Sequence, residues 1–172
     1  MIIKTVIVGE LETNCYIVAS ERTKEAMIID PGDEADKIIN AIEEDGLKPK
    51  LIINTHCHFD HVGANERLAK HFNIEMFDGN KEILRTGELE FRVIRTPGHA
   101  QESICLLGER ALFSGDTLFA GDYGRTDLPG GSEKEMESSL KSLMGLPEDT
   151  RVYPGHGRST TIGEEKKLYA RH

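Results

Sequence analysis

The chain has 172 residues and a formal net charge of −9, and 38% of its residues are hydrophobic while 30% are charged. This length and composition predict a single domain spanning residues 1–172, of the soluble globular class rather than a disordered or membrane chain. The charge disfavours nucleic acid as a partner because it repels phosphate backbones, and no segment approaches the roughly 18 apolar residues of a membrane span.

The cysteines and the amino-terminal segment indicate the cytoplasm. Cys15, Cys57 and Cys105 are widely spaced, which argues against a disulfide framework and a thiolate zinc cluster. We interpret Cys15 and Cys57 as small buried hydrophobic residues rather than nucleophiles. Residues 1–8 alternate like a strand and lack the basic region and cleavage site of a signal peptide. A cytoplasmic protein is therefore expected, and its oligomeric state stays open.

The first part of the chain predicts an antiparallel sheet followed by a helix. Short β-branched runs between turn residues give three strands at residues 2–8, 14–19 and 26–29. Apolar residues at helical spacing then predict a helix from about residue 35 to 42, which Asp33 would cap at its start and Gly46 at its end. The strand predicted at residues 50–54 follows.

The second part predicts more strands and three helices. Further strands are expected at residues 74–77, 88–95, 102–107, 110–114 and 151–153. The helices follow from an apolar face at Ala64, Leu68 and Phe72, from a capping box at Ser132–Glu135, and from another at Thr161–Glu164 that opens a helix to about Ala170. The glycine-rich segment 117–131 predicts a long functional loop.

Two stretches of the chain follow one pattern. Each runs from a strand that ends in an acid, Asp30 or Asp116, through a helix and a proline to a strand followed by His56 or His156. Each half would thus present an acid and an imidazole at strand ends. The pattern predicts two similar halves with helices outside, an α/β fold arranged as a four-layered αββα sandwich whose site lies along one edge.

Metal-capable side chains are densest directly after the strand at residues 50–54. His56 and His58, at i and i+2 on extended backbone, point to one side and can reach one ion. Asp60 and His61 lie where the strand turns into a helix, so they can reach a second ion. Three more candidate ligands each follow a strand beside a glycine: His99, Asp116 and His156.

The size of this donor set predicts a dinuclear site. Five histidines and two aspartates are too many for one tetrahedral ion but suit two. Two divalent ions about 3.5–4 Å apart can hold a bridging water and supply hydroxide at neutral pH, so the reaction class is metal-assisted hydrolysis. Imidazole and carboxylate accept Zn and Fe, and Mn as well, so the donors leave the metal open.

The ordered motifs resemble those of the metallo-β-lactamase-fold hydrolases. The matching stretches are Asn14-Cys15-Tyr16, Asp30-Pro31-Gly32, residues 55–61, Pro97-Gly98-His99, residues 115–119 and Pro154-Gly155-His156-Gly157. By position, the resemblance implies one metal on His56, His58 and His99, a second on Asp60, His61 and His156, and a bridge through Asp116. It also implies the αββα sandwich.

A second motif resembles the glyoxalase II-like branch, the hydroxyacylglutathione hydrolases and their short bacterial relatives, which cleave thioesters. It is Gly124-Arg125-Thr126-Asp127 followed by Pro129-Gly130-Gly131. The implied substrate is a small acyl thioester, hydroxyacylglutathione-like, or a related ester, attacked by a metal-bridging hydroxide. A thiolate with a pKa near 8.5 leaves easily, and Asp60 is the candidate proton shuttle. Arg125 is a candidate for binding an anionic substrate group, with a structural ion pair as its alternative.

Two other functions stay open at this point. Glyoxalase II carries an additional C-terminal helical domain, whereas this chain ends at His172, so the substrate need not be a glutathione conjugate. One alternative is a mononuclear iron dioxygenase acting on persulfides, whose triad His56, His99 and Asp116 could supply. The other is a non-catalytic domain that metal merely stabilises.

Overall fold

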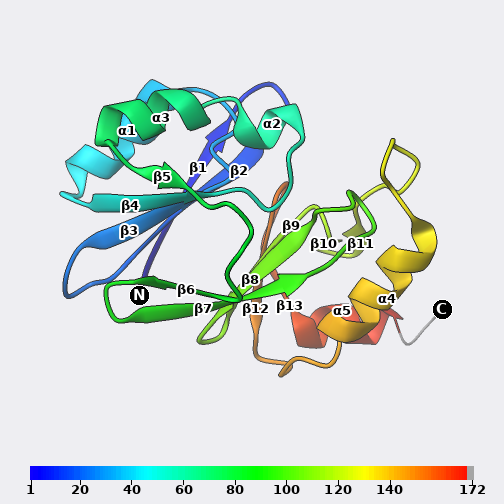
Figure 1. Ribbon diagram of the computed structural model, residues 1–172. Helices are drawn as coiled ribbons and strands as arrows, with labels where there is room; N and C mark the ends of the chain where they lie inside the picture. Colours follow the sequence, from blue (N-terminus) through cyan, green and yellow to red (C-terminus); the bar gives the residue numbers. More distant parts are fainter. Residues whose placement is uncertain (170–172) are drawn as a thin grey trace. The chain divides into compact units, whose positions relative to one another are not determined.

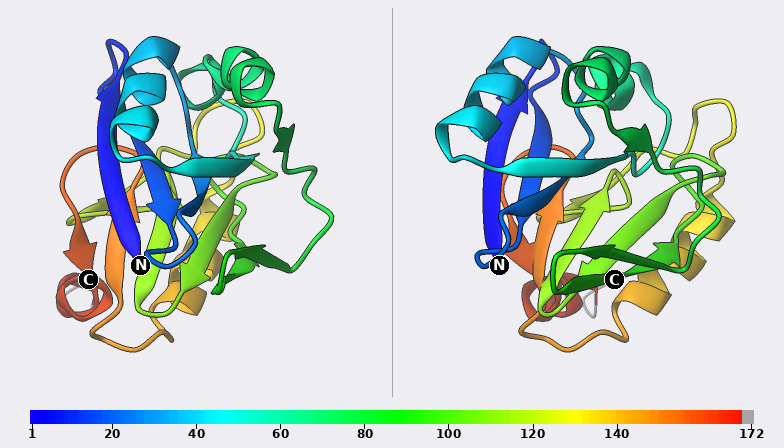
Figure 2. Two further views of the ribbon diagram at one scale, coloured as in Figure 1. Left: turned by 90° about the vertical axis from the view of Figure 1, so that its left-hand side faces the viewer. Right: turned by 60° about the vertical axis from the view of Figure 1, so that its left-hand side comes forward.

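The computed structural model describes residues 1–169, and the chain divides into two compact units, Met1–Phe91 and a second that begins at Arg92. Figures 1 and 2 follow the chain through both units. Within residues 1–169, no helix has the length and apolar character needed to cross a membrane.

The first unit is built on a five-stranded sheet with the order β1-β2-β3-β4-β5. Its strands are β1 (Ile2–Val8), β2 (Thr13–Ala19), β3 (Glu25–Ile29), β4 (Lys48–Ile53) and β5 (Glu75–Met76). The first three pair antiparallel, whereas β4 pairs parallel to both β3 and β5. The predicted antiparallel opening sheet is therefore confirmed.

Helices α1 (Ala35–Glu44) and α3 (Asn65–Phe72) cover one face of this sheet (Figure 1), and the short α2 (Phe59–Val62) precedes α3. Ile38 and Ile42 of α1 and Leu68 of α3 are fully buried in one core with the sheet. Burying one such side chain contributes about 1.5–3 kcal/mol. The apolar spacing therefore predicted both helices correctly.

The predicted N-cap of α1, Asp33, is wrong by one residue, whereas the glycine predicted at its end is right. The N-cap is Glu34, in the left-handed region at φ 46°, and it makes no capping bond through its side chain. Asp33 instead accepts a 2.6 Å hydrogen bond from the Glu34 N–H. Gly46, at φ 62°, follows the helix as predicted, because glycine adopts this conformation without steric cost.

The second sheet has the order β13-β12-β9-β8-β7-β6. Its strands are β6 (Ile83–Thr86), β7 (Leu89–Arg95), β8 (Ile104–Gly108), β9 (Ala111–Gly115), β12 (Arg151–Pro154) and β13 (Thr160–Thr161). The boundary between the units falls within β7. Strands β10 (Leu118–Phe119) and β11 (Asp122–Tyr123) form a separate hairpin inside the predicted long loop.

Helices α4 (Glu133–Leu143) and α5 (Ile162–Tyr169) belong to the second unit (Figure 1). Both predicted capping residues act as expected: Ser132 Oγ accepts from the N–H of Glu135 at 3.3 Å, and Thr161 Oγ1 accepts from that of Glu164 at 3.2 Å. Met136 of α4 packs in one core with Ile162 of α5. Ala170, the predicted end of the last helix, lies outside the described residues.

The repeated pattern is confirmed as a parallel β-α-β connection in each unit. In the first unit β3 pairs parallel to β4 across α1, and in the second β9 pairs parallel to β12 across α4. Asp30 follows β3 and Asp116 follows β9, while the histidines follow the partner strands. Because parallel strands end at one edge of a sheet, each unit presents its acid and imidazoles together.

Candidate metal centre

Asp30 organises the first set of candidate ligands. It is 1% exposed and occupies the left-handed region at φ 51°. Its carboxylate accepts hydrogen bonds of 2.7 Å from the N–H and from the hydroxyl of Thr55, the first residue of the motif. Nδ1 of His61 lies 3.1 Å from Oδ2 of the same carboxylate. One buried acid thus orients both ends of the motif.

These contacts select the ring nitrogen that offers a lone pair. The Thr55 hydroxyl donates its proton to Asp30, so it can only accept at its 3.2 Å contact with Nδ1 of His56. Nδ1 of His56 is then the protonated nitrogen, and Nε2 is the donor for a metal. At His61 the negative charge of the Asp30 carboxylate, 3.1 Å from Nδ1, favours the proton on that nitrogen. Such partners commonly orient histidine ligands.

The remaining first-unit candidates lie beside these two histidines. The ring centroids of His56 and His58 are 4.6 Å apart, and those of His56 and His61 are 4.1 Å apart. Asp60 Oδ2 lies 3.4 Å from Nε2 of His61 and accepts a 3.1 Å hydrogen bond from the Thr13 hydroxyl. The fold therefore brings His56, His58, Asp60 and His61 together, as the motif predicted.

A close approach of two backbone segments holds α2, which carries Asp60 and His61, against the loop after Asp30. A β-carbon built on Gly32 would lie 1.6 Å from the carbonyl oxygen of Asp60. Likewise, one built on Gly63 would lie 2.2 Å from the carbonyl oxygen of Gly32. Both positions therefore require glycine, which explains the Asp-Pro-Gly motif physically.

Replacing Gly32 by alanine should destabilise the protein by about 3 kcal/mol or more, because the new methyl group meets backbone that cannot move aside. The matched control is Gly46→Ala, at φ 62° with nothing within 4 Å of the new β-carbon. It should cost only about 1–2 kcal/mol, for the left-handed backbone. Urea unfolding of both variants tests the difference, and equal losses of stability would contradict the close-approach argument.

The second unit holds the other three candidates. Nε2 of His99 and Nε2 of His156 both lie 3.6 Å from Oδ2 of Asp116. Nδ1 of His99 contacts the backbone carbonyl of Arg125 at 2.8 Å. Since a carbonyl only accepts, Nδ1 of His99 carries the proton and Nε2 carries the lone pair. The three predicted residues are therefore brought together within this unit.

The spacing of these donor atoms fits a metal ion. Ligand atoms 2.0–2.1 Å from a tetrahedral ion lie about 3.3 Å from one another. The nitrogen–oxygen distances, 3.4 Å for His61–Asp60 and 3.6 Å for both contacts of Asp116, are near this value. They are longer than the roughly 2.7–3.2 Å of a direct hydrogen bond. These three pairs of donor atoms therefore have the spacing of two ligands that share one divalent ion.

Arg125 is engaged by a neighbouring acid. Its guanidinium donates two hydrogen bonds, of 2.7 and 2.8 Å, to the two oxygens of Asp127. This contact lowers the pKa of Asp127 to about 2. The structural ion pair that the sequence left open is thus present, and the role of Arg125 in binding substrate stays a prediction.

Three supporting groups were not assigned from the sequence. They are the Asp30 carboxylate, the Thr55 hydroxyl and the Arg125 carbonyl. Asp30 could have been found, because it ends a strand in the same pattern as Asp116. The Arg125 carbonyl could not, because a backbone acceptor has no sequence signature.

Cys15 and Cys57 differ in burial. Cys15 is fully buried, and burial raises the pKa of its thiol well above the usual value. Cys57, between His56 and His58, is exposed, so the predicted burial of this residue is wrong. The alternation that turns the two histidines to one side leaves the intervening side chain facing solvent.

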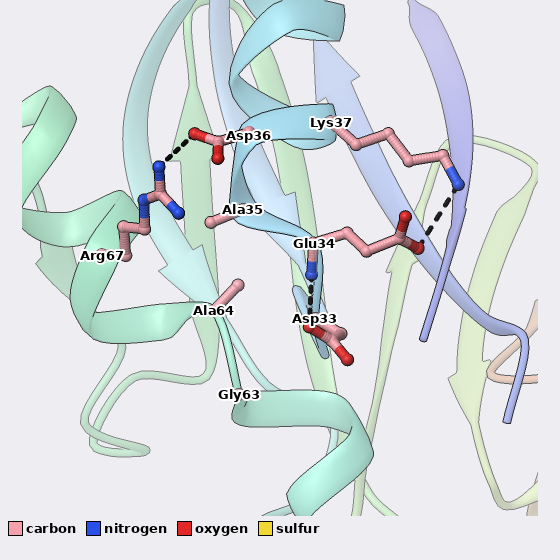
Figure 3. A pocket seen from close by; sticks show the side chains of 8 residues that line it. All are labelled: Asp33, Glu34, Ala35, Asp36, Lys37, Gly63, Ala64 and Arg67. Atoms are coloured by element: carbon pink, nitrogen blue, oxygen red, sulfur yellow. Dashed lines mark hydrogen bonds and ion pairs between the residues drawn. The ribbon is translucent and has the colours of Figure 1, made fainter. Parts of the chain in front are cut away.

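A pocket of about 390 Å³ on the first unit lies beside the motif but contains none of the seven candidates (Figure 3). Its charges are paired with each other: Arg67 with Asp36, and Lys37 with Glu34 at 3.4 Å. Asp33 bonds the Glu34 backbone. We therefore assign this pocket a structural role at the start of α1.

A protein-family model matches most of the chain, including all seven candidate ligands. The model of the metallo-β-lactamase superfamily matches residues 8–76 and 74–156. The chain belongs to the metallo-β-lactamase superfamily. It is 33% identical to hydroxyacylglutathione hydrolase GloC of Haemophilus influenzae, over 97% of this chain and 96% of that protein. It is also 35% identical to the probable hydroxyacylglutathione hydrolase glo2 of Schizosaccharomyces pombe, over 82% of this chain and 62% of the relative.

Solved structures agree with this assignment. The B3 metallo-β-lactamase BLEG-1 has a TM-score of 0.91 at 33% identity, over 96% of this chain and 97% of that one. ETHE1 from Myxococcus xanthus has a TM-score of 0.88 at 32% identity, over 99% of this chain and 84% of that one. TTHA1623, solved in a di-iron-bound form, has a TM-score of 0.86 at 33% identity, over 96% of this chain and 98% of that one. The predicted metallo-β-lactamase fold is confirmed, and the class of enzyme that these relatives support is a metal-dependent hydrolase.

Proposed function

We propose that the protein is a dinuclear hydrolase of small acyl thioesters. In this proposal one divalent ion is held by His56, His58 and His99, a second by Asp60, His61 and His156, and Asp116 bridges them. The first unit offers four candidate ligands and the second offers three. Neither number is enough to give three ligands to each of two ions, so the proposal uses the ligands of both units. A di-iron relative, TTHA1623, supports the number of ions.

The observation that carries the proposal is the orientation of the imidazoles. His56 and His99 each have Nδ1 engaged by an oxygen acceptor, which directs Nε2 toward a metal. His56 is 2% exposed and His99 is 4% exposed. Histidines of ordinary solvated turns do not need such burial. Buried imidazoles whose Nδ1 is held by an oxygen acceptor are an arrangement that metal binding explains.

Thioester cleavage follows from the chemistry that such a site supports. Two bound divalent ions would supply a nucleophile at neutral pH and stabilise the negative charge that develops on the carbonyl oxygen. The thiolate leaving group needs little protonation. Asp60, held by the Thr13 hydroxyl, is the residue proposed to pass any proton required. Two relatives named as hydroxyacylglutathione hydrolases support this substrate class.

The test is release of free thiol by metal-loaded protein from S-lactoylglutathione and simpler acyl thioesters. A β-lactam belongs in the same panel because of the similarity to BLEG-1. We expect turnover of at least one thioester. Absence of thiol release across the panel, or turnover of the β-lactam alone, would contradict the proposal.

A histidine variant separates catalysis from a purely structural metal. His58→Ala should lose metal and thioester turnover while the protein remains folded by circular dichroism, because His58 belongs to the proposed donor set. The matched control is His71→Ala, an exposed histidine that contacts Glu43 at 3.0 Å on α1. That variant should keep full metal content and activity. A His58→Ala protein that unfolds would instead favour the non-catalytic, metal-stabilised domain.

The second candidate is a mononuclear iron persulfide dioxygenase, and the similarity to ETHE1 from Myxococcus xanthus fits it. Its proposed iron ligands are His56, His99 and Asp116. Oxygen uptake with glutathione persulfide and a single iron per chain would favour this activity. Two metals per chain and no oxygen uptake would favour the hydrolase.

A further inference from the structure

A cavity of about 680 Å³ opens on the second unit, lined by the β10–β11 hairpin, α4 and α5. Its apolar lining includes Leu140 and Met144 of α4, Leu168 of α5, and the rings of Tyr123 and Tyr169. Both tyrosines are 37% exposed and Leu168 is 41% exposed. None of the seven candidate metal ligands lines the cavity. Its size is that of a site for a small organic molecule.

The charged groups of this cavity are predominantly acidic. Among the residues that the structure describes, the charged groups lining the cavity are the carboxylates of Asp122, Glu133, Glu137 and Glu165, together with the ammonium of Lys141. Two of the acids have fixed positions, because the Tyr123 hydroxyl donates to Glu133 at 3.0 Å and Glu165, 2% exposed, accepts from the N–H of Gly121 at 2.9 Å. The aromatic and aliphatic walls therefore lie within a fixed negative field.

The tyrosine hydroxyls respond to this field. Burial, followed by nearby negative groups that include Glu165 and Asp122, raises the pKa of Tyr169 to about 12. The hydrogen bond to Glu133 raises the pKa of Tyr123. Both rings therefore stay neutral phenols at physiological pH and present π faces, which attract cations.

We propose that this cavity binds a small organic cation, an ammonium carrying an apolar or aromatic body. The carboxylates would hold the charge, Tyr123 and Tyr169 would contact it through their π faces, and Leu140, Met144 and Leu168 would cover the apolar body. An anionic ligand would be repelled by the four acids. The net negative charge of hydroxyacylglutathione disfavours it as the occupant, and the cavity contains none of the candidate metal ligands of the proposed hydrolysis.

The probe is benzyltrimethylammonium. Benzyl alcohol is the control that has the aromatic ring but no charge, and tetramethylammonium is the control that has the charge but no ring. Two-dimensional ¹H–¹⁵N spectra should show saturable shifts from benzyltrimethylammonium at residues 121–123, 137–144 and 165–169. Each control compound should bind at least roughly fivefold more weakly, because it lacks one of the two interactions. The proposal would be overturned if benzyl alcohol bound as tightly as benzyltrimethylammonium, or if all the shifts fell outside these three ranges.

Two variants test the assigned contacts. Glu137→Gln and Tyr169→Leu should each weaken benzyltrimethylammonium binding by roughly threefold or more, since each loses part of the attraction for the cation. The matched control is Glu135→Gln on the same helix, whose side chain does not line the cavity. It should bind as the unmodified protein does. Unchanged binding in both test variants, or sedimentation showing a dimer that buries residues 121–123 and 165–169, would refute the assignment.

Discussion

Replacing Asp116 by asparagine is expected to lower thioester hydrolysis by roughly 10³, the effect of losing several kcal/mol of metal-derived stabilisation. One oxygen of Asp116 faces Nε2 of both His99 and His156 at 3.6 Å. The neutral amide keeps the volume of the side chain but removes the charge that would bind two cations. Metal analysis should accordingly show fewer ions per chain, measured alongside kcat/KM.

The control for this variant is Asp149→Asn, which neutralises an exposed aspartate paired with Arg110. It should retain metal and activity, because surface ion pairs contribute little. Both proteins should give the same circular dichroism spectrum. Full activity of the Asp116→Asn protein would remove this residue from the proposed site.

Replacing Asp30 by asparagine is expected to weaken metal binding by about 10–100-fold, the usual effect of losing a group that orients a ligand. The amide oxygen can still accept from the Thr55 N–H. Its NH₂ group, however, cannot accept from the Thr55 hydroxyl, and it faces the protonated Nδ1 of His61. Both histidines are then driven toward the wrong tautomer. Titration of the metal-free protein with Zn²⁺ measures the change.

The same variant should lose about 1–3 kcal/mol of stability, because one buried hydrogen bond is left unmade. Asparagine tolerates the left-handed conformation that Asp30 adopts, so the backbone is preserved. Asp33→Asn is the control, since its amide oxygen can keep the 2.6 Å bond from Glu34. If Asp30→Asn binds Zn²⁺ as tightly as this control, the orienting role of Asp30 is wrong.

Elements long enough for the apolar spacing to repeat were predictable from the sequence, and very short elements were not. Helices α1 and α4 bury residues at the expected spacing, and β1 to β3 match their predicted runs closely. Strands β6, β10, β11 and β13 have only two to four residues, too few to display a period of two. The segment from Ile83 to Thr86 was missed for this reason.

The sequence by itself determined the donor types and their local spacing, since i and i+2 residues on extended backbone share a side whatever surrounds them. It also determined that an acid follows the first strand of each β-α-β unit. Only the tertiary structure decided which imidazole nitrogen is offered, because that depends on Asp30, Thr55 and the Arg125 carbonyl, which contact the rings through folding. The tertiary structure likewise formed the acidic, tyrosine-lined cavity, since its walls come from three separate elements of the chain.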